Sequence, residues 1–132
     1  NYQQPVSFID FCPPSPCYKF YVTAGARRAD YRLVTLETSM EEQYSMLAKA
    51  GEHSIVRVSL TGEYRKFVDQ ALDTLPASSV LVIERIQRDR ESEEYWKELM
   101  ADDRTGVSFD LYYCGVIFLN SAIIKQNYIV NF

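Results

Sequence analysis

Apolar and polar side chains alternate along residues 54–60, which predicts a strand with one wetter face. Residues 79–86 are apolar for most of their length, so they predict a second and more fully buried strand. The β-rich run 31–36 predicts a third strand, and residues 39–50 between two of these strands predict a helix. We therefore expect the chain to be organised around residues 31–86.

The helix at residues 39–50 carries start and stop signals. Ser39 and Glu42 have the spacing of a capping box, and Gly51 stands just past the last turn, where a left-handed cap is common. Apolar residues fall at i, i+4 and i+7 from Met40, which gives the helix one apolar stripe. We expect this stripe to cover a sheet.

The C-terminal half reads as two helices followed by strands. A short helix from about Lys66 is ended by Pro76, and residues 92–100 predict another helix with an apolar face. The remaining β-rich runs are residues 107–113, 116–119, 123–124 and 128–130. We expect a C-terminal hairpin that completes or extends the sheet, with residues 128–130 as a last edge.

These elements predict an α+β, mainly β domain. Strands at residues 6–11 and 17–23, a turn at 24–30 and a bend at Gly62 favour a small OB-like antiparallel barrel or a strongly curved sheet, with two or three short helices. We expect a single domain, residues 1–132, divided into an N-terminal strand with a Cys/Pro loop (1–16), an OB-like core (17–90) and a helix plus C-terminal β extension (91–132).

Composition narrows the function classes. The chain has 132 residues, 14% of them aromatic, and a net charge of −4. An acidic chain lacks the clustered Lys and Arg that a phosphate-backbone binder needs, so nucleic acid is disfavoured as a partner. No apolar run reaches the roughly 20 residues that cross a bilayer, so we expect no transmembrane segment.

Three cysteines leave two alternatives open. Cys12 and Cys17 bracket a stiff insert, Pro13-Pro14-Ser15-Pro16, that can hold two chain segments close enough for a disulfide, and Cys114 lies in an apolar run. One bridge between Cys12 and Cys17 with one buried thiol is the simplest interpretation. Three reduced cysteines in a cytosolic protein is the other.

No catalytic or metal-binding constellation stands out. His53 is the only histidine, and it has no Cys or acidic neighbours at ligand spacing, so we expect a surface loop residue. Hydrolase, phosphate-binding and zinc-protease motifs are absent from the sequence. Adjacent acidic residues such as Asp102-Asp103 fit caps or solvated loops. We expect no cofactor, no metal and no enzymatic activity.

A resemblance is carried by the order Arg27-Arg28, Tyr31-Arg32-Leu33-Val34, Met40-Glu41-Glu42-Gln43-Tyr44, Ile55 through Tyr64 and Val80-Leu81-Val82-Ile83-Glu84. Over residues 27–86 this order resembles the OB-fold module at the C-terminal end of NlpE-type envelope stress lipoproteins. The Cys-x-x-Cys motif of that family has no counterpart here. The resemblance implies a non-catalytic module of the periplasm or cell envelope, with any lipid anchor upstream of residue 1, and it transfers no binding residue.

We therefore expect a non-catalytic interaction module of an exported bacterial protein that works through protein–protein contacts. Candidate exposed contact aromatics are Tyr64, Trp96, Tyr112 and Tyr113, and the C-terminal strands favour strand addition or self-association into a homo-oligomer. A single-stranded nucleic-acid-binding OB domain is the alternative, because such barrels stack bases on aromatics. An enzyme whose carboxylates converge from distant strands is the lesser one.

Overall fold

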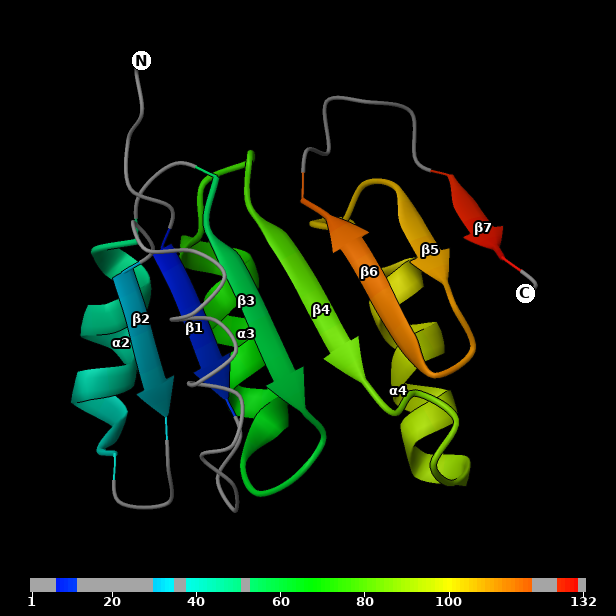
Figure 1. Cartoon of the computed structure of the whole chain (residues 1–132), viewed down its shortest axis with the longest axis horizontal. Coiled ribbons are helices and arrows are strands. Elements are labelled where there is room, and N and C mark those ends of the chain that lie inside the picture. The colour runs from blue at the N-terminus through cyan, green and yellow to red at the C-terminus, as the bar shows by residue number, and fades with distance from the viewer. Residues whose placement is uncertain (1–6, 12–29, 35–37, 51–52, 120–125, 131–132) are drawn as a thin grey trace.

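The strands form one open, mixed sheet. The computed structural model describes residues 7–11, 30–34, 38–50, 53–119 and 126–130. Its strands are β1 Ser7–Phe11, β2 Asp30–Val34, β3 Ile55–Ser59, β4 Val80–Glu84, β5 Ser108–Asp110, β6 Cys114–Phe118 and β7 Asn127–Ile129. Across the sheet they lie in the order β2-β1-β3-β4-β6-β5-β7 (Figure 1).

Strand direction divides this sheet in two. The pairs β1/β2, β1/β3 and β3/β4 are all parallel. β6 runs antiparallel to both of its neighbours, β4 and β5, and β7 is parallel to β5. Among the described strands, β6 is thus the one that runs against the others. It joins the C-terminal strands to the parallel half, so the two halves of the sequence share one sheet.

Within the described residues, three helices cover one face of this sheet. They are α2 Met40–Ala48, α3 Tyr64–Thr74 and α4 Arg90–Ala101, and Figure 1 shows them all behind the strands. The predicted capping box begins α2, because Ser39 Oγ accepts from the Glu42 N–H and Glu42 Oε1 accepts from the Ser39 N–H, both at 3.1 Å. Asp89 caps α4 by accepting from the Ser92 N–H at 2.8 Å.

The core lies between the helices and the covered sheet face. Alternate residues of each strand point to this face, so Val56 and Val58 are fully buried. Phe11 stacks on Phe67 of α3 with ring centroids 4.6 Å apart. Other buried side chains of the cluster include Ile9, Val34, Leu47, Val68, Leu81, Ile83, Tyr95, Leu99 and Ile117. A single apolar layer therefore holds sheet and helices together.

One glycine sets how closely α4 approaches the sheet. Trp96 of α4 lies against Gly115 of β6, where a Cβ atom would stand 2.3 Å from the indole Cη2. No side chain tolerates that separation, so the indole occupies the space that a β-carbon would need. Gly115 therefore lets Trp96, which is 3% exposed, pack closely against β6.

Several expected elements are confirmed. The strands expected at residues 54–60 and 79–86, the helices at 39–50 and 92–100 and the final edge strand correspond to β3, β4, α2, α4 and β7. The run 107–113 was expected as one strand, but β5 ends at Asp110 and the hairpin to β6 turns at residues 111–113. The turn expected at Asn120-Ser121 lies outside the described residues. The helix expected from Lys66 begins two residues earlier, at Tyr64. The expected strand at 17–23, the turn at 24–30 and the Cys12–Cys17 bridge lie outside the described residues.

The α+β class is confirmed, but the described strands do not form an antiparallel barrel. A helix between two strands carries the chain back over the sheet, so the second strand starts from the same end as the first and runs parallel to it. α3 does this between β3 and β4. Gly62 does not bend a strand. It takes a φ of 61° in the turn before α3.

Candidate functional site

The carboxyl ends of the parallel strands meet at one edge of the sheet. From β1 the chain moves to β2 on one side, and from β2 it returns past β1 to β3 on the other. The order therefore reverses between β1 and β3, which lie side by side. In open α/β sheets, ligands bind outside the carboxyl ends at such a switch point.

A buried ionic cluster spans three strands near this edge. Arg57 of β3 donates through Nη1 to Asp10 Oδ1 of β1 at 2.7 Å, and through Nε to Glu84 Oε2 of β4 at 3.2 Å. Arg57 stands between Val56 and Val58 in the strand, so its side chain points to the face opposite the helices. Asp10 is completely buried, and the Glu84 side chain is 29% exposed. Only Glu84 of the two carboxylates is within reach of a ligand.

A pocket adjoins Glu84 at the same edge. Its volume is about 540 Å³, and its walls come from the β4–α4 loop and the β5–β6 turn. The lining residues are Glu84, Arg85, Gln87, Arg88, Tyr112 and Tyr113. This volume falls within the range of roughly 300–1,000 Å³ that small-molecule sites occupy. We call this space the edge pocket.

A backbone hydrogen bond joins the two walls of the edge pocket, and each wall contains a residue in a strained conformation. Arg85 has a φ of 57° and Tyr112 a φ of 73°, the left-handed region that costs a non-glycine residue about 1–2 kcal/mol. Arg85 N–H donates to Tyr113 O at 2.8 Å, and Tyr112 N–H donates to Asp110 Oδ1 at 2.8 Å. Such strain persists only where neighbouring bonds hold it, and it clusters at functional sites.

The edge pocket carries uneven charge. Arg85 is exposed, and in the described part of the chain it forms no ion pair. Arg88 Nε lies 3.0 Å from Asp89 Oδ2. The Asp89 carboxylate accepts from the Ser92 N–H and contacts Arg88, and these bonds, that from Ser92 first, lower the pKa of Asp89 below its usual value. Arg85 is therefore the cation most available to a ligand.

Cys114 lies beside the cluster, opposite Glu84 in the β4–β6 register. It is a free thiol, and burial, followed by the charges of Glu84 and Asp110, raises its pKa. A thiol held protonated is a poor nucleophile. Cys114 thus packs as a small apolar side chain in this site.

The structure separates the four predicted contact aromatics. Tyr112 and Tyr113 are 58% and 77% exposed and line the edge pocket, with their rings edge to face at 4.9 Å. The exposure expected for Tyr64 and Trp96 is wrong. Tyr64 is 6% exposed because it packs edge-on against Tyr95, and its hydroxyl donates to Glu91 Oε2 at 2.9 Å. Trp96 is covered by its contact with Gly115.

The sequence analysis missed the arginines of the edge pocket. Arg85 and Arg88 stand in a stretch of mixed charge that is typical of a solvated connection. A usable signal was their position directly after a buried strand. It becomes informative only once that strand is known to be parallel, because its carboxyl end then faces the ligand edge.

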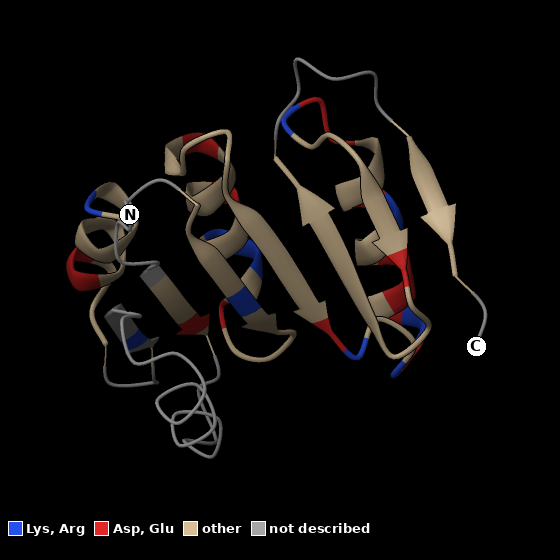
Figure 2. Cartoon of the chain, turned by 45° about the horizontal axis from the view of Figure 1, so that its top comes forward, with Lys and Arg blue, Asp and Glu red and all other residues tan. Residues whose placement is uncertain are grey.

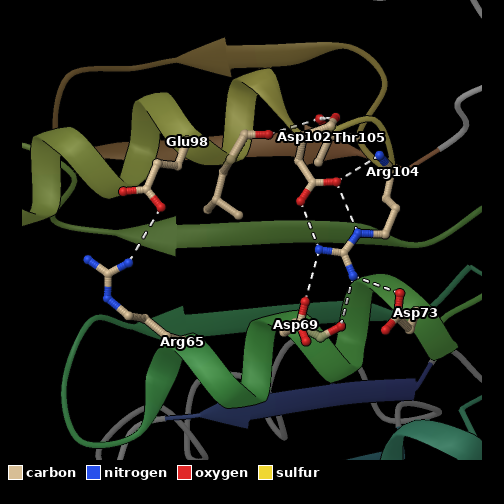
Figure 3. Close-up of polar contacts among 8 residues, drawn as sticks. Arg65, Asp69, Asp73, Glu98, Asp102, Arg104 and Thr105 are labelled. Carbon is tan, nitrogen blue, oxygen red and sulfur yellow. Dashed lines mark hydrogen bonds and ion pairs between the residues drawn. The ribbon is translucent and has the colours of Figure 1, made fainter.

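A second charged cluster lies between helices α3 and α4 (Figure 3). Arg104 contacts Asp69, Asp73 and Asp102 at 3.0, 2.7 and 2.8 Å. Its hydrogen bond to Asp102 is the largest of the effects that raise the pKa of Arg104. Arg65 pairs with Glu98 at 3.5 Å and lies 4.7 Å from the Tyr95 ring centroid. These pairs line a groove of about 350 Å³. The charges on the two walls already pair with each other across the groove, so these ion pairs join α3 to α4 and to the loop after it.

In the described residues, no group of three or more His, Cys, Asp and Glu side chains could hold a metal ion. No described helix is both long and apolar enough to span a bilayer. His53 is exposed in a turn with a φ of 60°, and its N–H donates to Ser78 Oγ at 3.1 Å. Its expected place in a surface loop is confirmed.

Asp10 of β1 and Glu84 of β4 come from strands far apart in the sequence and lie on either side of Arg57. Both accept from the same guanidinium, so they hold Arg57 in place.

No known family model matches the chain, and no curated protein is significantly similar to it.

Proposed function

We propose that this domain binds a small nucleotide-like ligand, one with a planar ring and an anionic group, in the edge pocket. The observation that carries the proposal is the pairing of Arg85 with two exposed tyrosines across one pocket, held by the Arg85–Tyr113 backbone bond. The proposed role is binding, which the sequence analysis also expects. The proposal retains Tyr112 and Tyr113, two of the contact residues predicted from the sequence.

Each wall offers different chemistry. Guanidinium groups recognise phosphate or carboxylate through paired N–H donors, which suits Arg85 and Arg88 to the anionic group. Tyrosine faces stack on planar rings, which suits Tyr113 to a base. Glu84 and Gln87 supply acceptors for hydroxyl or amino groups. A mononucleotide presents all three kinds of group within one small molecule.

Strand order supports the same class of ligand by analogy of fold. The order β2-β1-β3-β4 matches the start of the 2-1-3-4-5 order, in which a mononucleotide cofactor sits at the β1/β3 switch point. The edge pocket lies at the same carboxyl edge but beyond β4 and the β5–β6 turn, so the analogy supports the edge and not the position along it. The glycine fingerprint of dinucleotide sites does not follow β1 in the sequence, which reads Cys-Pro-Pro-Ser-Pro-Cys at residues 12–17. We therefore limit the proposal to a ligand the size of a mononucleotide.

Calorimetric titration tests the proposal with defined probes: AMP, adenosine, inorganic phosphate and a thymidine octamer. AMP should bind with a dissociation constant below about 1 mM, and adenosine or phosphate alone should bind at least about tenfold more weakly, because each fills half of the recognition. Arg85→Gln and Tyr113→Ala should each weaken AMP about tenfold, a loss of about 1.4 kcal/mol.

Arg90→Ala is the matched control, because Arg90 is an arginine of the same region that is 92% exposed and outside the pocket lining. It should leave AMP binding unchanged. Absence of AMP binding, or equal losses in all three variants, would sink the proposal. Tighter binding of the octamer than of AMP would favour the single-stranded nucleic-acid alternative.

A second candidate is the protein-interaction role expected from the sequence. The edge strand β7, whose three residues are all exposed, favours it, since a strand at the end of a sheet can accept a further strand. An envelope location, suggested by the resemblance to NlpE-type lipoproteins, goes with this candidate. Labelling free thiols in unreduced protein from its native host tests that location: one label supports it, and three labels argue for a reducing compartment.

A further inference from the structure

Strand β7 forms one end of the sheet. Within the described residues it pairs only with β5, and its three residues are all exposed. Tyr128 is 44% and Ile129 75% exposed. Residues 126–130 read Gln-Asn-Tyr-Ile-Val, with no charged side chain and no proline. Protein edges usually carry such guards, so this edge is open to pairing.

The backbone of β7 presents donors and acceptors outward. Ser108 N–H donates to Gln126 O at 2.9 Å, and Val130 N–H donates to Asp110 O at 2.8 Å. These bonds fix which residues of β7 face β5. Because backbone groups alternate sides along a strand, the N–H and C=O groups of Asn127 and Ile129 face away from the sheet.

An aromatic ladder runs across β6, β5 and β7 and ends at this edge. The rings of Phe118 and Phe109 are edge to face at 6.0 Å, and Phe109 stacks on Tyr128 at 5.3 Å. The ladder stands on the face opposite the helices, because the alternate β6 residue Ile117 points into the core. Phe118 is 41% exposed. Tyr128 is the last ring of the ladder, and of the ladder rings only Phe109 stacks on it.

We propose that two copies of this chain pair through β7 as antiparallel strands about a two-fold axis at Tyr128. Asn127 then lies opposite Ile129 of the second copy, and each such pair exchanges two N–H···O=C bonds through the groups that face outward. Tyr128 meets Tyr128 of the second copy as a non-hydrogen-bonded pair, in which side chains approach most closely.

Two features select a second copy over an unrelated strand. The aromatic ladder continues without a break through the two Tyr128 rings into the Phe109 and Phe118 rings of the other copy, and aromatic cross-strand pairs stabilise sheets. The neutral edge also sets no like charges against each other across the axis, which a self-paired edge must avoid. The same patch serves both copies, as an isologous interface requires.

Sedimentation equilibrium over 5–500 µM protein, roughly the range in which small interfaces dissociate, tests the proposal. The wild-type chain should show a reversible monomer–dimer equilibrium. Ile129→Pro removes one outward N–H and leaves the β5 bonds intact, and Tyr128→Lys sets two charges on the axis. Each should raise the dissociation constant at least about tenfold.

Tyr44→Lys is the matched control, because Tyr44 is a 55% exposed tyrosine on α2, and it should dimerise like wild type. Register is tested in a chain whose native cysteines are serine. There Tyr128→Cys should form an intermolecular disulfide under mild oxidation, and Asn127→Cys should not. A monomer at every concentration, a dimer indifferent to both edge variants, or crosslinking by Asn127→Cys in place of Tyr128→Cys would overturn the proposal.

Discussion

Arg57 and Arg104 each gather carboxylates from different elements, yet their surroundings differ. Arg57 lies in the sheet, with its side chain 9% exposed, between Asp10 and Glu84. Arg104 lies after α4, 34% exposed, and reaches three aspartates. Figure 2 shows charged residues chiefly on helices and at strand ends, with few along the strands. Burial, and not the number of partners, decides what each arginine contributes.

The two clusters also differ in what they can do. Charges buried together must stay paired, because a lone buried ion is costly, so the Arg57 cluster fixes the relative positions of β1, β3 and β4. Exposed pairs contribute little and are screened by salt. The Arg57 cluster supports the edge pocket through Glu84, which belongs to both.

The largest effect is expected from breaking the buried cluster. Arg57→Met removes the guanidinium that bonds the wholly buried Asp10, and loss of one member of a buried pair costs about 3–5 kcal/mol. Urea unfolding followed by circular dichroism should show this loss in the free energy of unfolding.

The neutral triple variant Asp10→Leu, Arg57→Met, Glu84→Gln is the control, because replacing these three charges by groups of similar size removes the buried carboxylate together with the guanidinium it bonds. It should recover most of the lost stability. If the single and triple variants were equally unstable, shape and not charge would explain the cluster.

A smaller effect is expected from Arg104→Ala. The pairs with Asp69, Asp73 and Asp102 are partly exposed, so their loss should cost about 1 kcal/mol or less. The difference from wild type should shrink between low salt and about 1 M salt, where screening reaches about 3 Å. Urea unfolding at both salt concentrations measures it. A loss as large as that of Arg57→Met would contradict the contrast drawn from burial.

The smallest effect concerns the exposed cap of α4. Hydrogen bonds lower the pKa of Asp89 below its ordinary value of 3.8, so its contribution to stability is fully present above about pH 4. It is lost as the pH falls through the lower pKa of the folded state. Asp89→Asn keeps a capping oxygen but does not titrate. Between pH 6 and pH 2 the melting temperature should therefore fall less steeply for the variant than for wild type. Parallel curves of melting temperature against pH would contradict this.

Local elements could be read from the sequence because their signals are local. The capping box of Ser39 and Glu42 and the alternation in residues 54–60 each concern neighbours along the chain, and both are confirmed. Strand direction was misread because it depends on a connection. Gly62 and the β-rich composition favoured an antiparallel barrel, whereas the predicted helix after that glycine implied a parallel crossover.

The candidate site depended still more on long-range contacts. Tyr112 and Tyr113 were predicted as contact aromatics because they stand in a β-rich tail. Nothing near them in the sequence indicates Arg85, whose N–H donates to the carbonyl oxygen of Tyr113. Trp96 was misplaced because its partner Gly115 lies nineteen positions away and has no side chain to signal a contact. Asp10 and Arg57 likewise meet only because β1 and β3 are neighbours.

The measurement that tests the central claim most directly is two-dimensional ¹H–¹⁵N NMR of the whole chain titrated with AMP. Binding in the edge pocket predicts saturable shift changes confined to residues 84–88 and 111–114, with the Arg85 N–H among the largest because it joins the two walls. Shifts centred on the groove between α3 and α4, or no saturable shifts anywhere, would contradict a ligand site at the carboxyl edge.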